Sequence, residues 1–277
     1  MISNIKKNIY KKLYRSKIDT PEPHTLKNKF NFINKSPTYY FQKFGNKNKG
    51  KIFYVIKIYE KIKEGGGLFS YLLFVLHHLK IVEKLNVIPV IDMENFYNRY
   101  NETKPVKKIK NSWLYYFDKI SRYDLNEVYQ SDKVLMNGGF FSRSMSKNFK
   151  LEKNLKKVFD KYIKIKKEFI NNANQFEKKN FKNNKVLGVH LRGTDRIIMP
   201  DHPFPPTIDQ MFFLIDNAIK KYNFTKIFLI TDQIKYLKFF EKKYGNKLCY
   251  RKESFRSNLS KIFHLKVRKN HRFEIGR

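Results

Sequence analysis

Hydrophobic and polar residues follow strand and helix periods in turn along the first half of the chain. Residues 51–59 (KIFYVIKIY) form an apolar run typical of a strand, and a triple glycine follows at 65–67. Residues 68–85 then repeat their apolar side chains at helical spacing, and residues 86–93 (NVIPVIDM) resume a strand pattern. Strand, glycine loop, helix and strand together predict a βαβ unit.

A second block of the same kind follows residues 151–182, a Lys-rich segment without Gly or Pro that we interpret as helices connecting two halves. Thr207 and Gln210 form the spacing of a capping box, which predicts the start of a helix. Gly245 suits the end of the next helix. The predicted order is strand 185–191, helix 208–222, strand 226–230, a helix that ends near Gly245, and strand 247–250.

These patterns predict an α/β fold with two Rossmann-like lobes. In sequence order we expect a basic N-terminal arm and lead-in (1–50), an N-terminal Rossmann-like lobe (51–150), a helical connector (151–182) and a C-terminal Rossmann-like lobe (183–277). The C-terminal lobe offers only three strand patterns, so we expect it to be incomplete.

Charge adds one ambiguous observation. The 277 residues include 59 Lys and Arg against 24 Asp and Glu, a net charge of +35. Such a field would attract nucleic acid, anionic lipid or phosphate-bearing substrates. The lysines are spread along the chain with many Asn and Ile, however, as an AT-rich genome would impose without selection for binding. Both interpretations stay open, although a nucleic-acid binder would need clustered charge that the sequence lacks.

Cysteine and histidine usage narrows the possible sites. A single cysteine, Cys249, excludes an intramolecular disulfide and a cysteine-based metal cluster, and fits a reducing cytoplasm. His77 and His78 are adjacent and cannot face one ion from a helix, so we expect no metal site. The first 20 residues lack the apolar core of a signal peptide. They form either a solvated arm or a segment that lies on a membrane surface.

The chemistry concentrates in VLGVHLRGTDR, residues 186–196, where an apolar strand ends in polar side chains. His190 and Arg192 are two residues apart, so their side chains are expected on the same face of that strand. The Arg192 guanidinium suits phosphate oxygens, Gly193 allows close approach of the backbone, and Asp195 could hold the arginine in place.

A second polar cluster, Thr231 to Gln233, ends the next predicted strand. Ligands of open α/β sheets bind at the carboxyl ends of the strands, so both clusters should meet at one edge. Asp232 could accept hydrogen bonds from a ribose or a base. The alternative is structural, because aspartates at strand ends often cap helices or form local ion pairs. In outline this edge is a nucleotide-sugar or nucleotide-phosphate pocket.

HLRGTDR, followed by FLITDQ and then SFRS at residues 254–257, resembles the motifs of the fucosyltransferase superfamily that joins alpha-1,6-, alpha-1,2- and protein O-fucosyltransferases. Residues 65–96, from the triple glycine onward, and residues 111–135 resemble the amino-terminal lobe of bacterial members assigned to surface-polysaccharide and lipopolysaccharide biosynthesis. The resemblance extends from about Lys51 to the end of the chain.

The resemblance implies a GT-B-like fold and an inverting transfer of fucose from GDP-fucose to a glycan acceptor, without a metal or other cofactor. It implies that His190 contacts the guanosine, Arg192 the diphosphate and Asp232 the guanine, while Asp195 buttresses the loop. The donor-site residues carried over are His190, Arg192, Gly193, Thr194, Asp195, Thr231, Asp232, Arg256 and Ser257, with a glycine loop of Gly65, Gly66 and Gly67. A cytoplasmic enzyme at the inner face of an anionic membrane, with a lipid-linked acceptor and no nucleic-acid partner, would fit.

Two departures and one open role accompany the resemblance. Many relatives have a second arginine where this chain has Gly193, and an asparagine where it has Tyr71. A general base for the acceptor hydroxyl is expected in the first lobe, where Asp92 and Glu94 end a strand and Glu64 precedes the glycines. Capping or surface roles for these acids stay equally open.

Two other functions remain. One is an inactive relative that only binds sugar nucleotide or a partner, and the other is a basic nucleic-acid-binding protein. Because serines and a further helix and strand of the family's second lobe are not found before residue 277, we expect weak GDP binding and impaired transfer.

Overall fold

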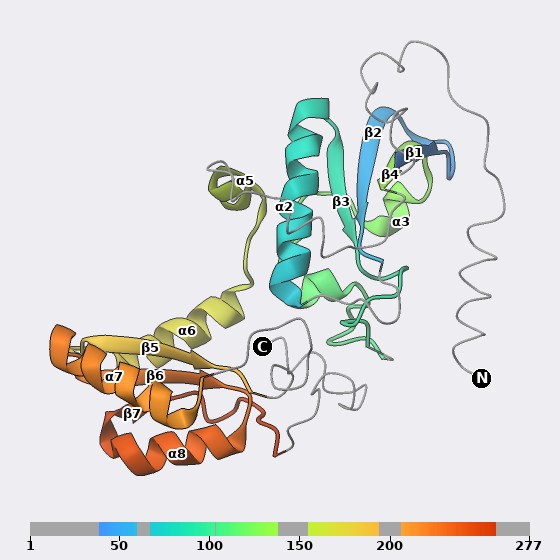
Figure 1. The fold of residues 1–277 in the computed structure, drawn as a ribbon. Coiled ribbons are helices and arrows are strands. Elements are labelled where there is room, and N and C mark those ends of the chain that lie inside the picture. Colours follow the sequence, from blue (N-terminus) through green and yellow to red (C-terminus); the bar gives the residue numbers. More distant parts are fainter. Residues whose placement is uncertain (1–38, 60–66, 103, 138–154, 194–205, 259–277) are drawn as a thin grey trace. The chain divides into compact units, whose positions relative to one another are not determined.

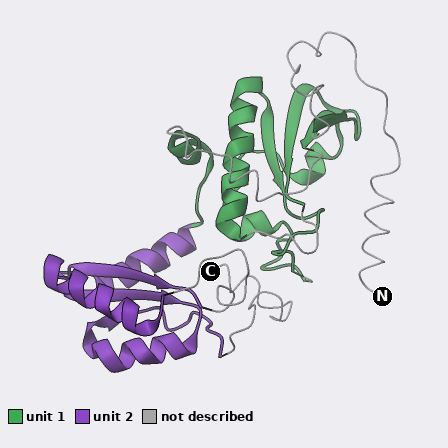
Figure 2. Cartoon of the chain, viewed as in Figure 1, with its two compact units in different colours: residues 1–166 green, residues 167–277 purple. Residues whose placement is uncertain are grey.

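A computed structural model describes residues 39–59, 67–102, 104–137, 155–193 and 206–258. The chain divides into two compact units, Met1–Lys166 and Lys167–Arg277 (Figure 2). Of the expected connector, α5 (Leu155–Tyr162) lies in the first unit and α6 (Lys167–Asn180) lies in the second.

The first unit is built on a four-stranded sheet in the order β1-β4-β2-β3 (Figure 1). Strand β2 is parallel to both β3 and β4, whereas β1 is antiparallel to β4. The strands are β1 (Tyr39–Gln42), β2 (Lys47–Lys57), β3 (Ile88–Asp92) and β4 (Ser131–Asn137). β2, helix α2 (Leu68–Leu85) and β3 form the βαβ unit that the hydrophobic pattern predicts.

Both faces of this sheet are covered. Tyr54 on one face hydrogen-bonds with His78 of α2, at 2.6 Å between Oη and Nδ1. Phe53 and Val55 on the other face pack with Val128, the last residue of the short helix α3 (Leu125–Val128). Burial of each large side chain contributes about 1.5–3 kcal/mol to the free energy of unfolding. Because β2 buries such side chains on both of its faces, it is the centre of this core.

The second unit has a parallel sheet in the order β5-β6-β7. Its elements are β5 (Val186–Leu191), α7 (Ile208–Tyr222), β6 (Lys226–Thr231), α8 (Ile234–Tyr244), the 3-10 turn η2 (Gly245–Lys247) and β7 (Leu248–Cys249). Ile215 of α7 and Phe240 of α8 pack with Leu229 on one face of the sheet. The ring centroids of Phe176 of α6 and Phe228 of β6 are 5.2 Å apart. Phe228 points to the opposite face of the sheet from its buried neighbours in the strand. The helices therefore enclose the sheet from two sides.

The predicted helix boundaries of this unit are confirmed. The Thr207 hydroxyl accepts a hydrogen bond from the Gln210 N–H at 3.2 Å, and the Gln210 side chain accepts one from the Thr207 N–H at 2.9 Å. Gly245 ends α8 with a φ of +46°, a backbone conformation that favours glycine.

The α/β class expected from the sequence is confirmed by these two sheets and their helices. The expectation of an incomplete second lobe concerns residues 259–277, which lie outside the described part of the chain. Among the described residues, no helix combines the length and apolarity that crossing a membrane requires.

Candidate functional site

The two polar clusters of the second unit lie side by side at one edge of the sheet. β5 and β6 are parallel neighbours with Leu191 opposite Thr231, so the residues that follow each strand emerge together (Figure 1). This is the edge at which open α/β sheets bind ligands. The Thr231 hydroxyl is buried beneath it and accepts a hydrogen bond from the Gln233 N–H at 3.3 Å.

Asp232 joins the two clusters. Its Oδ1 accepts a hydrogen bond from the Gly193 N–H at 3.0 Å, and its Oδ2 lies 3.9 Å from Nε of Arg192. The Arg192 side chain remains 41% exposed. Asp232 therefore orients the loop after β5, and the Arg192 side chain is partly exposed at the same edge.

Gly193 is required by close packing. A Cβ at this position would lie 2.3 Å from Cε2 of Tyr236 and 2.8 Å from Oε1 of Gln233. Gly188, within β5, has no atom within 4 Å of such a Cβ. The backbone at Gly193 is therefore approached closely by the first turn of α8. Its predicted close approach to a ligand stays a prediction.

The segment around residues 251–258 completes this edge. The Ser257 N–H donates to the Asp232 carbonyl at 2.8 Å, and the Ser257 carbonyl accepts from the Ile234 N–H at 3.1 Å. Arg256 donates from Nη1 to the Ser254 carbonyl at 2.8 Å and from Nη2 to the Arg251 carbonyl at 2.9 Å. Both residues thus act on the local backbone.

His190 is exposed between the buried residues Val189 and Leu191, as the strand pattern predicts. Its imidazole lies on the face of β5 away from the α7 and α8 core. The candidate residues Thr194 and Asp195 lie outside the described residues, and so do Glu64, Gly65 and Gly66. Gly67 is described and precedes the first residue of α2.

In the first unit, the Asp92 carboxylate organises the turn after β3. Its oxygens accept hydrogen bonds from the backbone N–H groups of Glu94 and Asn95, the Asn95 side chain and the Tyr129 hydroxyl. The residue is fully buried. These contacts favour a positioning role for Asp92 and leave Glu94 as the more accessible acid of the pair.

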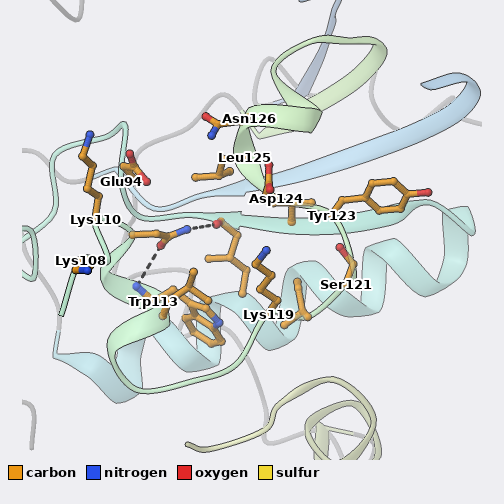
Figure 3. A pocket seen from close by; sticks show the side chains of 15 residues that line it. Glu94, Lys108, Lys110, Trp113, Lys119, Ser121, Tyr123, Asp124, Leu125 and Asn126 are labelled. Carbon is orange, nitrogen blue, oxygen red and sulfur yellow. Dashed lines mark hydrogen bonds between the residues drawn. The ribbon is translucent and has the colours of Figure 1, made fainter. Parts of the chain in front are cut away.

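Glu94 lines a pocket of about 330 Å³ between the turn after β3 and the start of α3 (Figure 3). Burial raises the pKa of the Glu94 carboxyl, Asp92 raises it further, and Lys110 opposes both. A carboxylate whose pKa is shifted toward neutrality is a better proton acceptor, as a general base requires.

Lys57 and Asn137 lie at the same end of the first sheet as Asp92, and neither was predicted from the sequence as a site residue. Lys57 is opposite Asp92 in the register of β2 and β3, and it is buried. Burial lowers the pKa of its ammonium group to about 8, an effect that Asp92 opposes. Asn137 accepts from the Lys57 N–H at 2.6 Å and donates to the Lys57 carbonyl at 2.9 Å. The sequence signal that could have identified both residues is a polar side chain at the end of an apolar strand.

Two further residues singled out in the sequence are structural here. Tyr71 is fully buried and its ring lies edge-on to Tyr100, with centroids 5.4 Å apart. His78 is buried against Tyr54, and burial lowers the pKa of its imidazole to about 3. Within the described ranges, no group of three or more His, Cys, Asp or Glu side chains is arranged to hold a metal ion.

No family model matches the chain, and no curated protein matches it. Among solved structures, it is similar to fucosyltransferase NodZ from Bradyrhizobium, at 12% identity over 82% of each chain with a TM-score of 0.46. A NodZ alpha-1,6-fucosyltransferase co-crystallised with GDP gives 12% identity over 82% of this chain and 81% of that chain, with the same TM-score. POFUT1 in complex with GDP-fucose gives 12% over 72% and 60%, with a TM-score of 0.27. At these values, function has to be inferred from this chain's own residues.

Proposed function

We propose that this protein is a glycosyltransferase that moves fucose from GDP-fucose to a glycan acceptor, with inversion at the anomeric carbon and without a metal. The observation that carries the proposal is the arrangement of Arg192, Gly193 and Asp232 at the shared edge of β5 and β6. The fucosyltransferase-like motifs of the sequence supply the identity of the donor.

Arg192 binds the diphosphate in this proposal. When the bond between the anomeric carbon and the diphosphate oxygen breaks, negative charge grows on the departing GDP. A cation held beside that oxygen stabilises the transition state more than the ground state, which lowers the barrier. Asp232 helps to hold the guanidinium and the Gly193 backbone ready for this contact.

Glu94 acts as the general base. The acceptor hydroxyl oxygen attacks the anomeric carbon from the side opposite the diphosphate, and its proton passes to the Glu94 carboxylate. The partial burial of Glu94 and its raised pKa support this role. Asp92 positions Glu94 through the hydrogen bond from the Glu94 backbone. His190 is assigned to the guanosine, and Thr231 and Ser257 support the loops around it.

The biological setting is an extension of the same proposal. We place the enzyme in the bacterial cytoplasm, in surface-polysaccharide or lipopolysaccharide biosynthesis, with a lipid-linked acceptor and contact with anionic lipid at the inner face of the membrane. Basic residues near such a surface contribute about 1 kcal/mol each. Pelleting with vesicles that contain anionic lipid, but not with neutral vesicles, tests the membrane contact.

Calorimetric titration tests the donor assignment. GDP and GDP-fucose are expected to bind at physiological salt, while duplex DNA is not, and Arg192→Ala should weaken GDP binding. Lys238→Ala, which removes one exposed charge from α8, is the matched control and should bind GDP normally. Binding of DNA without GDP would overturn the proposal. Binding of GDP-fucose with no hydrolysis or transfer on any glycan would favour the inactive relative.

A further inference from the structure

The pocket beside Glu94 has a strongly basic rim. Lys108, Lys110 and Lys119 all line it (Figure 3). All three lysines are exposed, whereas the neighbouring lining includes the apolar residues Val90 and Leu125. An apolar floor beneath a few polar groups is the usual composition of a small-molecule site, and the volume is at the lower end of the common range of about 300–1,000 Å³.

The acids of the pocket do not neutralise this rim evenly. The Asp124 carboxylate accepts a hydrogen bond from the Glu127 N–H at 3.0 Å as the cap of α3. Glu94 interacts electrostatically with Lys110. Lys108 and Lys119 form no ion pair with any residue in the described part of the chain. Two ammonium groups are therefore available to a ligand.

The turn that carries Lys108 is held in a costly conformation. Lys107 and Lys108 both have positive φ, +50° and +67°, between hydrogen bonds that join Val106 and Ile109 at 2.9 and 2.8 Å. Such two-residue turns favour Asn-Gly, because a Cβ strains the left-handed backbone: glycine has none, and the short asparagine side chain can hydrogen-bond to the local backbone. Strain of this kind is found most often at functional sites, where the side chain is needed.

Ser121 supplies a second, independent observation. It lines the pocket, and its hydroxyl is shielded from solvent without a hydrogen-bond partner among the described residues. Buried hydroxyl groups are nearly always paired in native proteins.

We propose that this pocket binds a negatively charged group of the acceptor, so that the acceptor is a glycan that carries a carboxylate or a phosphate. The identification of the bound molecule as the acceptor rests on the proposed glycosyl transfer. The presence of an anion site does not depend on it. Lys108 and Lys119 would contact the anion, Ser121 would contact a hydroxyl, and Glu94 would face the sugar hydroxyl that reacts.

Binding in the absence of any donor tests the site without relying on transfer. Three probes are titrated into the full chain in 0.15 M salt: galacturonic acid for the carboxylate, galactose 6-phosphate for the phosphate, and galactose as the neutral match. At least one charged sugar should bind at least 10-fold more tightly than galactose. The charged sugar that binds more tightly shows whether the site recognises a carboxylate or a phosphate.

Two double variants separate the pocket from the general charge of the protein. Lys108→Gln with Lys119→Gln should weaken binding of the charged sugar about 10-fold. Lys238→Gln with Lys242→Gln removes the same charge from the exposed side of α8 and should leave it unchanged. Ser121→Ala should weaken binding of all three sugars alike, because it removes a contact to a hydroxyl group.

Equal affinity for charged and neutral sugars, no binding of any probe, or equal losses in the two double variants would overturn the anion site. GDP titrated into the same samples keeps the two proposals apart. Normal GDP binding without sugar discrimination would remove only the anionic acceptor, whereas sugar discrimination without GDP binding would remove only the donor assignment.

Discussion

Arg192 and Asp232 follow adjacent parallel strands, and Nε of Arg192 lies 3.9 Å from Oδ2 of Asp232. Because the same carboxylate accepts from the Gly193 N–H, one acid controls both the cation and the backbone of the proposed phosphate loop. Asp232 therefore has a defined role that does not depend on direct contact with the base of the nucleotide.

A double-mutant cycle distinguishes the two roles of Asp232. If Asp232 orients Arg192, the losses of GDP affinity in Arg192→Ala and Asp232→Ala should not add, and the coupling energy should exceed about 0.5 kcal/mol. If Asp232 instead binds the guanine independently, the two losses should add within that margin. Calorimetry on the two single variants and the double variant measures this directly.

Gly193→Ala should destabilise the second unit. The new Cβ would overlap the Tyr236 ring and the Gln233 amide, and such overpacking costs about 1–3 kcal/mol. Urea denaturation measures the loss, and GDP affinity should fall with it because the loop must shift. Gly188→Ala, where a Cβ meets open space, is the control and should change the unfolding free energy by less than about 0.5 kcal/mol. Equal stability of the two variants would contradict the close packing.

Glu94→Gln should lower kcat by about 10²- to 10⁴-fold while leaving GDP affinity unchanged, because only proton transfer is removed. In the wild type, the raised pKa of Glu94 places the acid limb of kcat/KM above the range of an ordinary carboxyl, and activity should increase with pH through it. Lys110→Gln removes a group that lowers the pKa of Glu94, so the limb should move to higher pH. A limb that is unchanged in Lys110→Gln would exclude Glu94 as the base.

Lys57→Met should remove a pH dependence of stability. The folded-state pKa of Lys57 is lowered to about 8, so between that pH and about 10.5 the unfolded chain holds a proton that the folded chain has released. The free energy of unfolding of the wild type should therefore increase with pH in this window, by up to about 3 kcal/mol, relative to Lys57→Met. Urea denaturation from pH 7.5 to 10 tests this, with Lys84→Met on the exposed side of α2 as the control.

Local patterns were sufficient for the βαβ unit of the first half and for the strands and helices of the second. The helix at 68–85 and the strands around it follow from spacing alone, because each buries one continuous face. The proximity of Arg192 and Asp232 also followed, since the carboxyl ends of parallel neighbours share an edge. In these cases a single element or a single crossover determines the result.

The missed features depend on partners that are distant in the chain. β1 lies in the segment that was expected to be a basic arm, and it forms only by pairing with β4, about a hundred residues later. The burial of Lys57 beside Asp92 and Asn137 requires three strands to be in register. The lysines around Glu94 are separated by a turn and a 3-10 helix, η1 (Ser112–Tyr115), so no sequence period links them.

The close contact between Gly193 and the Tyr236 ring also constrains how this protein can diverge. Many relatives in the resembling superfamily carry a second arginine at the glycine position, and that side chain would need the volume that the ring fills. A lineage that starts from this sequence would have to move the Tyr236 ring, or replace it with a smaller side chain, before it acquired the arginine, because the reverse order passes through an overpacked intermediate. Positions 193 and 236 are therefore expected to be epistatic and to covary among homologues.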